Sequence, residues 1–335
     1  MEQLCAVWYG KHDLRLERRV VPALAARDVL VEVALCGVCG TDVHILEGEY
    51  PLVKPPRVLG HEFSGTVRDV GSGVTTVRAG DRVAVDPTVS CGGCFYCRAG
   101  LPLMCDNRVS HHGGLGEFVV LPEQIVYSLP PGVSLEVAAL AEPLSCCLHT
   151  IDRAGIRPGD NVAVVGAGTI GLMLVQLARR AGATHVLVSE PSSAKREMAQ
   201  RLGADVVVDP LHEDLQAAAR DMCGGRGVDV ALEAVGARQT VIDALALPRR
   251  GGTVVLMGVA SPLTEVPLRP FDLFERELTI RGAYIREFEF QRTVELLPLL
   301  ELQSLITDRF PLMQAVDAVA NVKSGHGIKT VVEPH

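Results

Sequence analysis

Long apolar runs are missing from this sequence of 335 residues. The longest ones, such as Val29–Cys36, are interrupted by a charged residue, here Glu32, and none reaches the ~18 residues that a membrane-spanning helix needs. The N-terminal segment also lacks the basic start and the long apolar stretch of a secretory signal peptide. We therefore expect a cytoplasmic protein that has no membrane partner.

Basic clusters are missing as well. The chain has 32 Lys and Arg against 40 Asp and Glu, which gives a formal net charge of -8. Nucleic-acid binding requires clustered Lys and Arg, so the charge balance predicts no nucleic-acid partner. There is also no long repeat and no low-complexity tract. The length and the 48% of hydrophobic residues are ordinary for a globular protein with two domains.

The chain changes character near residues 137–155. Before that point, short Val-rich runs at 29–35, 65–70, 82–85 and 117–121 are separated by Gly and Pro turns, which is typical of an irregular β-barrel or sandwich. From Asn161 onward, predicted strands at 162–165, 185–189, 206–208, 228–233, 253–257 and 277–281 alternate with helices at 171–180 and 194–202. That alternation predicts an α/β domain with a doubly wound parallel sheet. We expect a last helix near 288–300 and a last strand at 329–332.

A dinucleotide-binding motif lies at the start of the second region. The sequence Gly-Ala-Gly-Thr-Ile-Gly follows the strand that ends at Val165 and opens a helix. In this context Gly166 makes the tight turn, Gly168 lets the backbone approach a pyrophosphate, and Gly171 permits close packing of helix and strand. Glu190 follows at the end of the next strand and is placed to accept hydrogen bonds from both ribose hydroxyls, which favours NAD over NADP. Lys195 lies nearby and softens that preference.

Four of the ten cysteines form a compact motif at Cys91, Cys94, Cys97 and Cys105. Four thiolates make a closed, structural zinc site with no open position for a substrate. Ferredoxins place their fourth cysteine after three residues and before Pro, whereas Cys105 follows after seven residues and precedes Asp106. The spacing therefore favours zinc. A zinc ribbon that binds nucleic acid is disfavoured by the acidic charge.

A second metal site is indicated by Cys39, the pair His61-Glu62, and Glu142. One thiolate, one imidazole and one carboxylate make three protein ligands, which leave the fourth position of a catalytic zinc open. Such a zinc acidifies a bound alcohol, whose hydride then passes to a nicotinamide ring. The hydroxyl of Thr41 is placed to contact the alcohol, and the imidazole of His44 is placed to pass the proton outward.

Taken together, these motifs resemble those of the zinc-containing medium-chain dehydrogenase/reductase superfamily over nearly the whole chain. The resemblance is carried by Gly60–Val67 with Gly80–Val83, by the cysteine quartet, and by the glycine motif with Val188–Pro191. It implies a GroES-like, β-rich catalytic domain at 1–148 and 291–335, with a structural zinc lobe at about 88–108, and a Rossmann NAD-binding domain at 149–290. It also implies two zinc ions per chain and NAD as cofactors.

The resemblance further assigns residues. Cys39 and His61, with either Glu62 or Glu142, would surround the catalytic zinc; the choice between the two glutamates stays open. Thr41 and His44 match the proton relay of the family. The positions that line the coenzyme are Gly166, Gly168, Ile170, Gly171, Glu190, Lys195 and Tyr284.

The subfamily is less sharply marked. Glu142–His149 resembles the polyol (sorbitol) dehydrogenases, whereas Val188–Pro191 and the segment from Tyr284 to Glu287 resemble threonine and butanediol dehydrogenases. Ile45 and Arg286 depart from the sorbitol pattern. We expect a small alcohol or polyol as substrate, oxidised to a ketone, with an enzyme resembling L-threonine 3-dehydrogenase or a non-catalytic dinucleotide-binding protein as alternatives. Related enzymes are dimers or tetramers, so the resemblance implies a homodimer or homotetramer.

Overall fold

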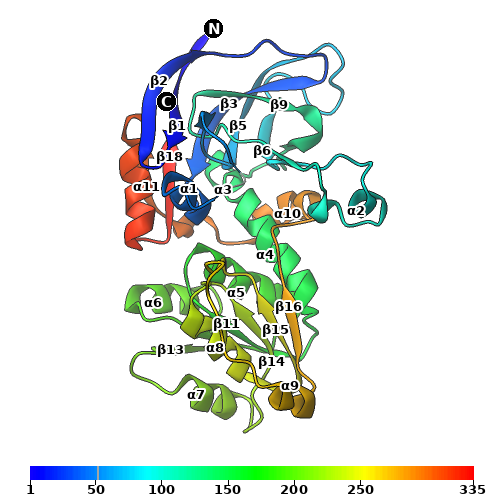
Figure 1. Ribbon diagram of the computed structural model, residues 1–335, viewed down its shortest axis with the longest axis vertical. Coiled ribbons are helices and arrows are strands. Elements are labelled where there is room, and N and C mark those ends of the chain that lie inside the picture. The colour runs from blue at the N-terminus through cyan, green and yellow to red at the C-terminus, as the bar shows by residue number, and fades with distance from the viewer. Residues whose placement is uncertain (51–52) are drawn as a thin grey trace. The chain divides into compact units, whose positions relative to one another are not determined.

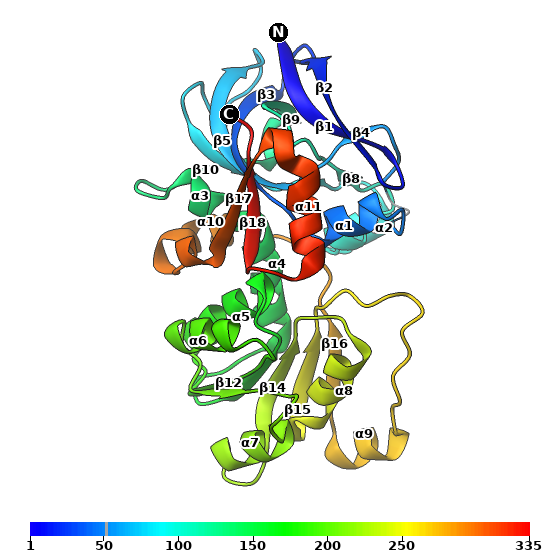
Figure 2. The ribbon, with the colours of Figure 1, turned by 90° about the vertical axis from the view of Figure 1, so that its left-hand side faces the viewer.

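The chain forms two structural units. The computed structural model describes residues 1–50 and 53–335. The first unit comprises Met1–Pro143 together with Glu287–His335, and the second comprises Leu144–Arg286. Both are visible in Figures 1 and 2.

The first unit is mainly β-structure. Its largest sheet has the strand order β10-β6-β5-β3-β18-β17, with β9 also paired to β3, and β1, β2 and β4 form a smaller sheet. The strands are β1 (Glu2–Gly10), β2 (Asp13–Val20), β3 (Asp28–Gly37), β4 (Arg57–Val58), β5 (Glu62–Val70), β6 (Arg82–Val85), β7 (Thr88–Val89), β8 (Val109–Ser110), β9 (Phe118–Pro122), β10 (Val126–Ser128), β17 (Ile306–Pro311) and β18 (Lys329–Glu333). The helices are α1 (Gly40–Leu46), α2 (Phe95–Arg98), α3 (Leu135–Ala138), α10 (Phe290–Leu296) and α11 (Ala315–Ser324).

Strand β3 lies at the centre of this unit. Val29, Val31 and Val33 alternate along it and are fully buried, because successive side chains of a strand point to opposite faces of the sheet. At its end, Gly37 is paired with Glu62 of β5 on one side and with Val331 of β18 on the other. The pairing brings residues from the C-terminal segment beside His61 and Glu62.

The second unit is a parallel sheet flanked by helices (Figure 1). Its strand order is β13-β12-β11-β14-β15-β16, and the strands are β11 (Asn161–Val165), β12 (His185–Ser189), β13 (Val206–Val208), β14 (Val228–Glu233), β15 (Pro248–Leu256) and β16 (Thr279–Gly282). The helices are α5 (Thr169–Ala181), α6 (Ser193–Arg201), α7 (Leu215–Met222), α8 (Arg238–Ala246) and α9 (Pro270–Arg276). The strand order reverses between β11 and β14, and ligands of such sheets bind at this switch point.

The predicted fold class, a β-rich domain with a doubly wound parallel sheet, is confirmed. The helix expected at 288–300 is shorter, since α10 ends at Leu296 and a 3₁₀ turn follows. It was wrongly expected to be the last helix, because α11 follows it at Ala315–Ser324. Helix α4 (Ala141–Ala154) was missed. Its Pro143 reads as a helix breaker in the sequence, but proline is tolerated in the first turn of a helix. In the part of the chain that the structure describes, no helix has the length and apolar character to cross a membrane.

Candidate active site

Cys39 caps the N-terminus of α1. Its backbone is extended, with φ -104° and ψ 157°, and its N–H donates to Oδ2 of Asp42 at 2.9 Å. This bond fixes the turn that enters the helix. The Sγ of Cys39 is hydrogen-bonded to Oγ1 of Thr41 at 3.6 Å, so the predicted alcohol-contacting hydroxyl lies beside the predicted metal ligand.

The predicted metal ligands Cys39, at the start of α1, and His61 and Glu62, at the start of β5, lie close together. One donor atom each from Cys39, His61 and Glu62 lies within 4.8 Å of the others, and Glu62 is 2% exposed. Sulfur, nitrogen and carboxylate oxygen are the donors that zinc takes in proteins. The three side chains therefore fit a zinc ion that keeps a fourth position for another ligand.

Asp42 is a site residue that we missed in the sequence. It is fully buried, and its Oδ1 lies 3.6 Å from Nδ1 of His61. Burial opposes a positive charge on His61, but the Asp42 carboxylate and Cys39 outweigh it and raise the pKa of His61 well above its usual value. A carboxylate behind a metal-binding histidine orients the ring and increases its basicity. The signal was present in the sequence, because Asp42 follows Cys39 by three residues.

Lys329 is the second residue that we missed. It comes from β18, and its Nζ pairs with Oε2 of Glu62 and donates to the carbonyl of Val38 at 3.0 Å. Burial disfavours the ammonium, but Glu62 outweighs it, and the pKa of Lys329 is raised. The ion pair of Lys329 and Glu62 requires glycine at position 37 of β3, which lies between β5 and β18. A Cβ at this position would overlap both Glu62 and Lys329. A lysine so far along the chain gave no local signal.

The other predicted catalytic residues lie in the same unit. Glu142 is buried in the first turn of α4 and is not among the three residues whose donor atoms converge. His44 lies on α1, and its Nδ1 is 3.0 Å from Oε2 of Glu49. Its side chain is 45% exposed, so this imidazole is in contact with solvent.

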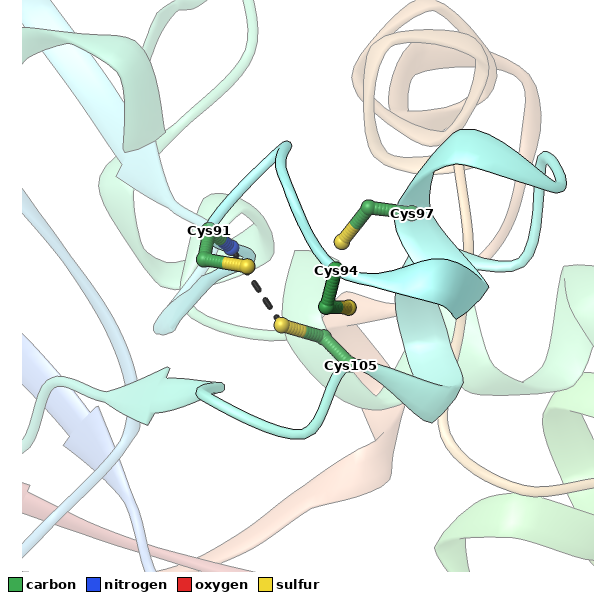
Figure 3. A group of neighbouring side chains, drawn as sticks. All are labelled: Cys91, Cys94, Cys97 and Cys105. Atoms are coloured by element: carbon green, nitrogen blue, oxygen red, sulfur yellow. Dashed lines mark hydrogen bonds between the residues drawn. The ribbon is translucent and has the colours of Figure 1, made fainter.

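The cysteine quartet converges as expected. Cys91 follows β7, Cys94 and Cys97 belong to the cap and the body of α2, and Cys105 follows a 3₁₀ turn. Figure 3 shows the side chains turned toward one another, and one sulfur from each lies within 4.8 Å of the others. Backbone N–H groups of Gly93 and Cys94 lower the pKa of Cys91 to about 6. The group fits a tetrahedral, closed zinc site.

We predict that Cys94→Ser weakens the fold of this lobe. Metal-binding free energy is folding free energy, and a loss of about 3 kcal/mol corresponds to a melting temperature lowered by roughly 10 °C. Differential scanning calorimetry with zinc analysis checks this. The exposed Leu101 in the same lobe offers a control, Leu101→Ser, which should retain zinc and melt as the wild type does. A zinc-replete Cys94→Ser protein of unchanged stability would contradict the structural role.

The glycine motif joins β11 to α5 in the predicted way. Gly166 has a φ of +99°, which glycine adopts without strain. A Cβ on Gly171 would overlap the carbonyl oxygen of Gly166, whereas a Cβ on Gly168 would meet nothing within 4 Å. Close packing at Gly171 and open space at Gly168 fit a turn that receives a pyrophosphate at a helix N-terminus.

Glu190 ends β12 beside this turn. Its Oε2 accepts from the N–H of Ala167 at 2.8 Å, and its Oε1 accepts from the N–H of Ser192 at 3.0 Å. The carboxylate thereby links the glycine turn to the neighbouring strand. Ile170 lies on α5 and Lys195 on α6, while Tyr284 follows β16 and is 41% exposed.

Comparison with known proteins identifies the family. The alcohol dehydrogenase GroES-like domain matches residues 25–131, and the zinc-binding dehydrogenase family matches 169–301. D-xylulose reductase A of Aspergillus oryzae is 34% identical, over 99% of this chain and 96% of that protein. The chain belongs to the zinc-dependent medium-chain dehydrogenases, in their polyol dehydrogenase branch. D-arabinitol dehydrogenase 1 of Uromyces fabae is 33% identical to this dehydrogenase, over 99% of this chain and 98% of that one.

A solved structure agrees with this assignment. A zinc-binding dehydrogenase from Sinorhizobium meliloti bound to NADP superposes on this dehydrogenase with a TM-score of 0.96, at 37% identity over 100% of both chains. The chain is therefore an enzyme of the zinc- and nicotinamide-dependent class. The alternative prediction of a non-catalytic dinucleotide-binding protein is not supported.

Proposed function

We propose that this dehydrogenase oxidises a secondary alcohol of a polyol to a ketone, with NAD as hydride acceptor. The first unit would be the catalytic domain and the second the coenzyme domain. The proposal is carried by the convergence of Cys39, His61 and Glu62, because three ligands of this kind are typical of a catalytic rather than a structural zinc. The relatives named for xylulose and arabinitol favour a polyol over L-threonine.

Zinc, when bound by Cys39, His61 and one of the two glutamates, would supply Lewis acidity that makes an alcohol proton easier to remove. Within the chain, Asp42 holds the His61 ring and Lys329 balances the charge of Glu62. Because Oε2 of Glu62 is engaged by Lys329, a metal held by this carboxylate would share it with the ammonium group. Glu142 is the alternative carboxylate.

The alcohol proton would leave by way of Thr41 and His44. The Thr41 hydroxyl lies beside Sγ of Cys39 and is placed to accept the alcohol proton while it passes its own proton, through water, to the imidazole of His44. His44, hydrogen-bonded to Glu49 and in contact with solvent, would receive a proton and release it to water.

Initial rates of NADH formation test the activity. The panel holds xylitol, arabinitol, sorbitol, 2,3-butanediol, simple secondary alcohols and L-threonine, each with NAD and with NADP. Turnover of pentitols above the other alcohols supports the proposal. Turnover of L-threonine alone would overturn the polyol assignment.

The coenzyme preference is expected to depend on the charge of Glu190. The variant Glu190→Gln keeps an acceptor for the N–H of Ala167 but loses the negative charge that repels a 2′-phosphate. Hydrogen bonds to a charged group contribute ~1.5–3 kcal/mol, so NAD should bind roughly 10- to 100-fold more weakly, and NADP should gain relative to NAD. Fluorescence titration with both coenzymes measures this. An unchanged ratio of the two affinities would exclude Glu190 as the ribose ligand.

We also propose a homodimer formed through β16. Among the described residues β16 pairs only with β15, and Leu263, Phe271 and Phe274, which precede β16 in the sequence, are 70–90% exposed. An unpaired strand edge with apolar neighbours is a surface that proteins cover. Light scattering should give the mass of a dimer or a multiple of it, and Phe274→Glu should lower it. Leu211→Glu, at another exposed apolar residue, serves as the control.

A cytoplasmic location stays a prediction.

A further inference from the structure

A second convergent group adjoins the proposed metal ligands. One oxygen of Asp42, one ring nitrogen of His61 and one ring nitrogen of His112 lie within 4.8 Å of one another. The rings of His61 and His112 meet edge to face, with centroids 5.5 Å apart and an interplanar angle of 66°. His61 therefore belongs to two groups, one with Cys39 and Glu62 and one with Asp42 and His112.

Polar atoms of this second group are buried without a hydrogen-bond partner from the protein. Oδ1 of Asp42, Nδ1 of His61 and Nδ1 of His112 are shielded from solvent and have no protein hydrogen-bond partner in the described part of the chain. Leaving such a group unsatisfied costs about 1–3 kcal/mol. One oxygen of Asp42 and one ring nitrogen from each histidine lie within 4.8 Å of one another, so a common point lies about 2.8 Å or less from each of these atoms, which is hydrogen-bond distance. One water molecule at that point would have three polar partners, as buried waters usually do.

The loop that carries His112 is tied to Gly60, the residue before His61. The N–H groups of Gly113 and Gly114 both donate to the carbonyl of Gly60, at 2.9 and 3.1 Å. A Cβ on Gly60 would press on the backbone of Leu115 at 2.8 Å. His112 is thus held beside His61 by backbone contacts that do not depend on its own side chain, so the side chain can be replaced without losing the loop.

We propose that His112 is a positioning residue for the metal-binding imidazole. Its ring N–H donates, through one bridging water, to the carboxylate of Asp42, and this holds Oδ1 of that carboxylate facing Nδ1 of His61, 3.6 Å away. A carboxylate at that position favours the tautomer of His61 in which Nδ1 carries the hydrogen and Nε2 carries the lone pair for the metal. The inference rests on the proposed function, because it needs His61 as a ligand of a catalytic zinc.

The test compares His112→Phe, which keeps an aromatic ring but no polar atom, with His112→Asn, which keeps a donor. His111→Asn is the matched control, since His111 is the neighbouring histidine and lies outside the group of three. Zinc affinity is measured by chelator competition, and the His61 tautomer by ¹⁵N–¹H correlation spectra. Steady-state kinetics separate kcat from KM.

Loss of a partner behind a metal ligand typically costs 10–100-fold in metal affinity or activity. We expect a loss of that size for His112→Phe, together with a mixed His61 tautomer and a lower kcat. The polyol KM of this variant should stay within about twofold of the wild-type value. His112→Asn should recover part of it, and His111→Asn should match the wild type. Wild-type zinc affinity and a single tautomer in His112→Phe would overturn the proposal. So would a raised KM alone, which indicates a substrate contact, or a further zinc equivalent that is lost with His112, which indicates a bridging metal.

The outcome is separable from that of the proposed function. If the wild-type protein oxidises no polyol, chelator competition and the histidine spectra still report on His112. If the wild-type protein is active but His112→Phe leaves both readouts unchanged, only the positioning role fails.

Discussion

Turnover should fall by at least about 10³-fold in Cys39→Ala, while the fold and the zinc of the cysteine quartet are retained. The variant removes one of three converging ligands, and Lewis-acid catalysis contributes several kcal/mol, at a tenfold change in rate for each 1.36 kcal/mol. Cys39 is only a cap of α1, and the Asp42 carboxylate does not need its side chain, because it accepts from the backbone N–H of residue 39. Zinc analysis should show the loss of one ion per chain.

Cys36→Ala provides the control. Cys36 is a fully buried thiol close in sequence to Cys39, and it belongs to none of the groups of converging donor atoms. We expect that variant to keep both zinc ions and most of the activity, with a modest loss of stability from the cavity. Cys39→Ala protein that retained full turnover would exclude the proposed catalytic zinc.

Lys329→Met should destabilise the zinc-free protein by ~3–5 kcal/mol, because it leaves the carboxylate of Glu62 buried without its cation. The two side chains are 5% and 3% exposed, so water cannot replace the lost partner. Zinc brings positive charge to the same carboxylate, and the loss should therefore be smaller in the zinc-loaded protein. Urea unfolding with and without zinc measures both values.

Two further variants separate charge from packing. Adding Glu62→Gln to Lys329→Met removes the unpaired charge and should recover much of the stability of the zinc-free protein. The pair formed by Lys323 and Glu47 lies at the surface, with Lys323 61% exposed, and Lys323→Met should cost less than about 1 kcal/mol. Equal losses of stability for Lys329→Met and Lys323→Met would show that burial does not make the pair of Lys329 and Glu62 more important for stability than the surface pair.

Local motifs in the sequence predicted much of this protein. The glycine turn, the cysteine quartet and the pair His61-Glu62 each lie within 15 residues or fewer, so their chemistry can be predicted from spacing. The alternation of strands and helices predicted the parallel sheet, because this pattern is also local to each segment of the sequence. Thr41 and Cys39 are hydrogen-bonded neighbours because they are only two residues apart at the N-terminus of α1.

Contacts that depend on strand pairing could not be predicted. Lys329 reaches Glu62 because β3 lies between β5 and β18 and carries Gly37 at the crossing point. His112 approaches His61 because its loop is hydrogen-bonded to Gly60. In each case the deciding partner is remote in the sequence or depends on a register that residues alone do not reveal.

The placement of β18 has a consequence for biosynthesis. The ribosome makes Cys39, His61 and Glu62 first, then the whole second unit, Leu144–Arg286, and only afterwards Lys329. At ~5–20 residues per second, the interval between Glu62 and Lys329 lasts on the order of ten seconds or more. During that time the carboxylate of Glu62 has no lysine beside it and is open to a metal ion. The nascent chain is thus expected to meet zinc before its last strand closes over the ligands.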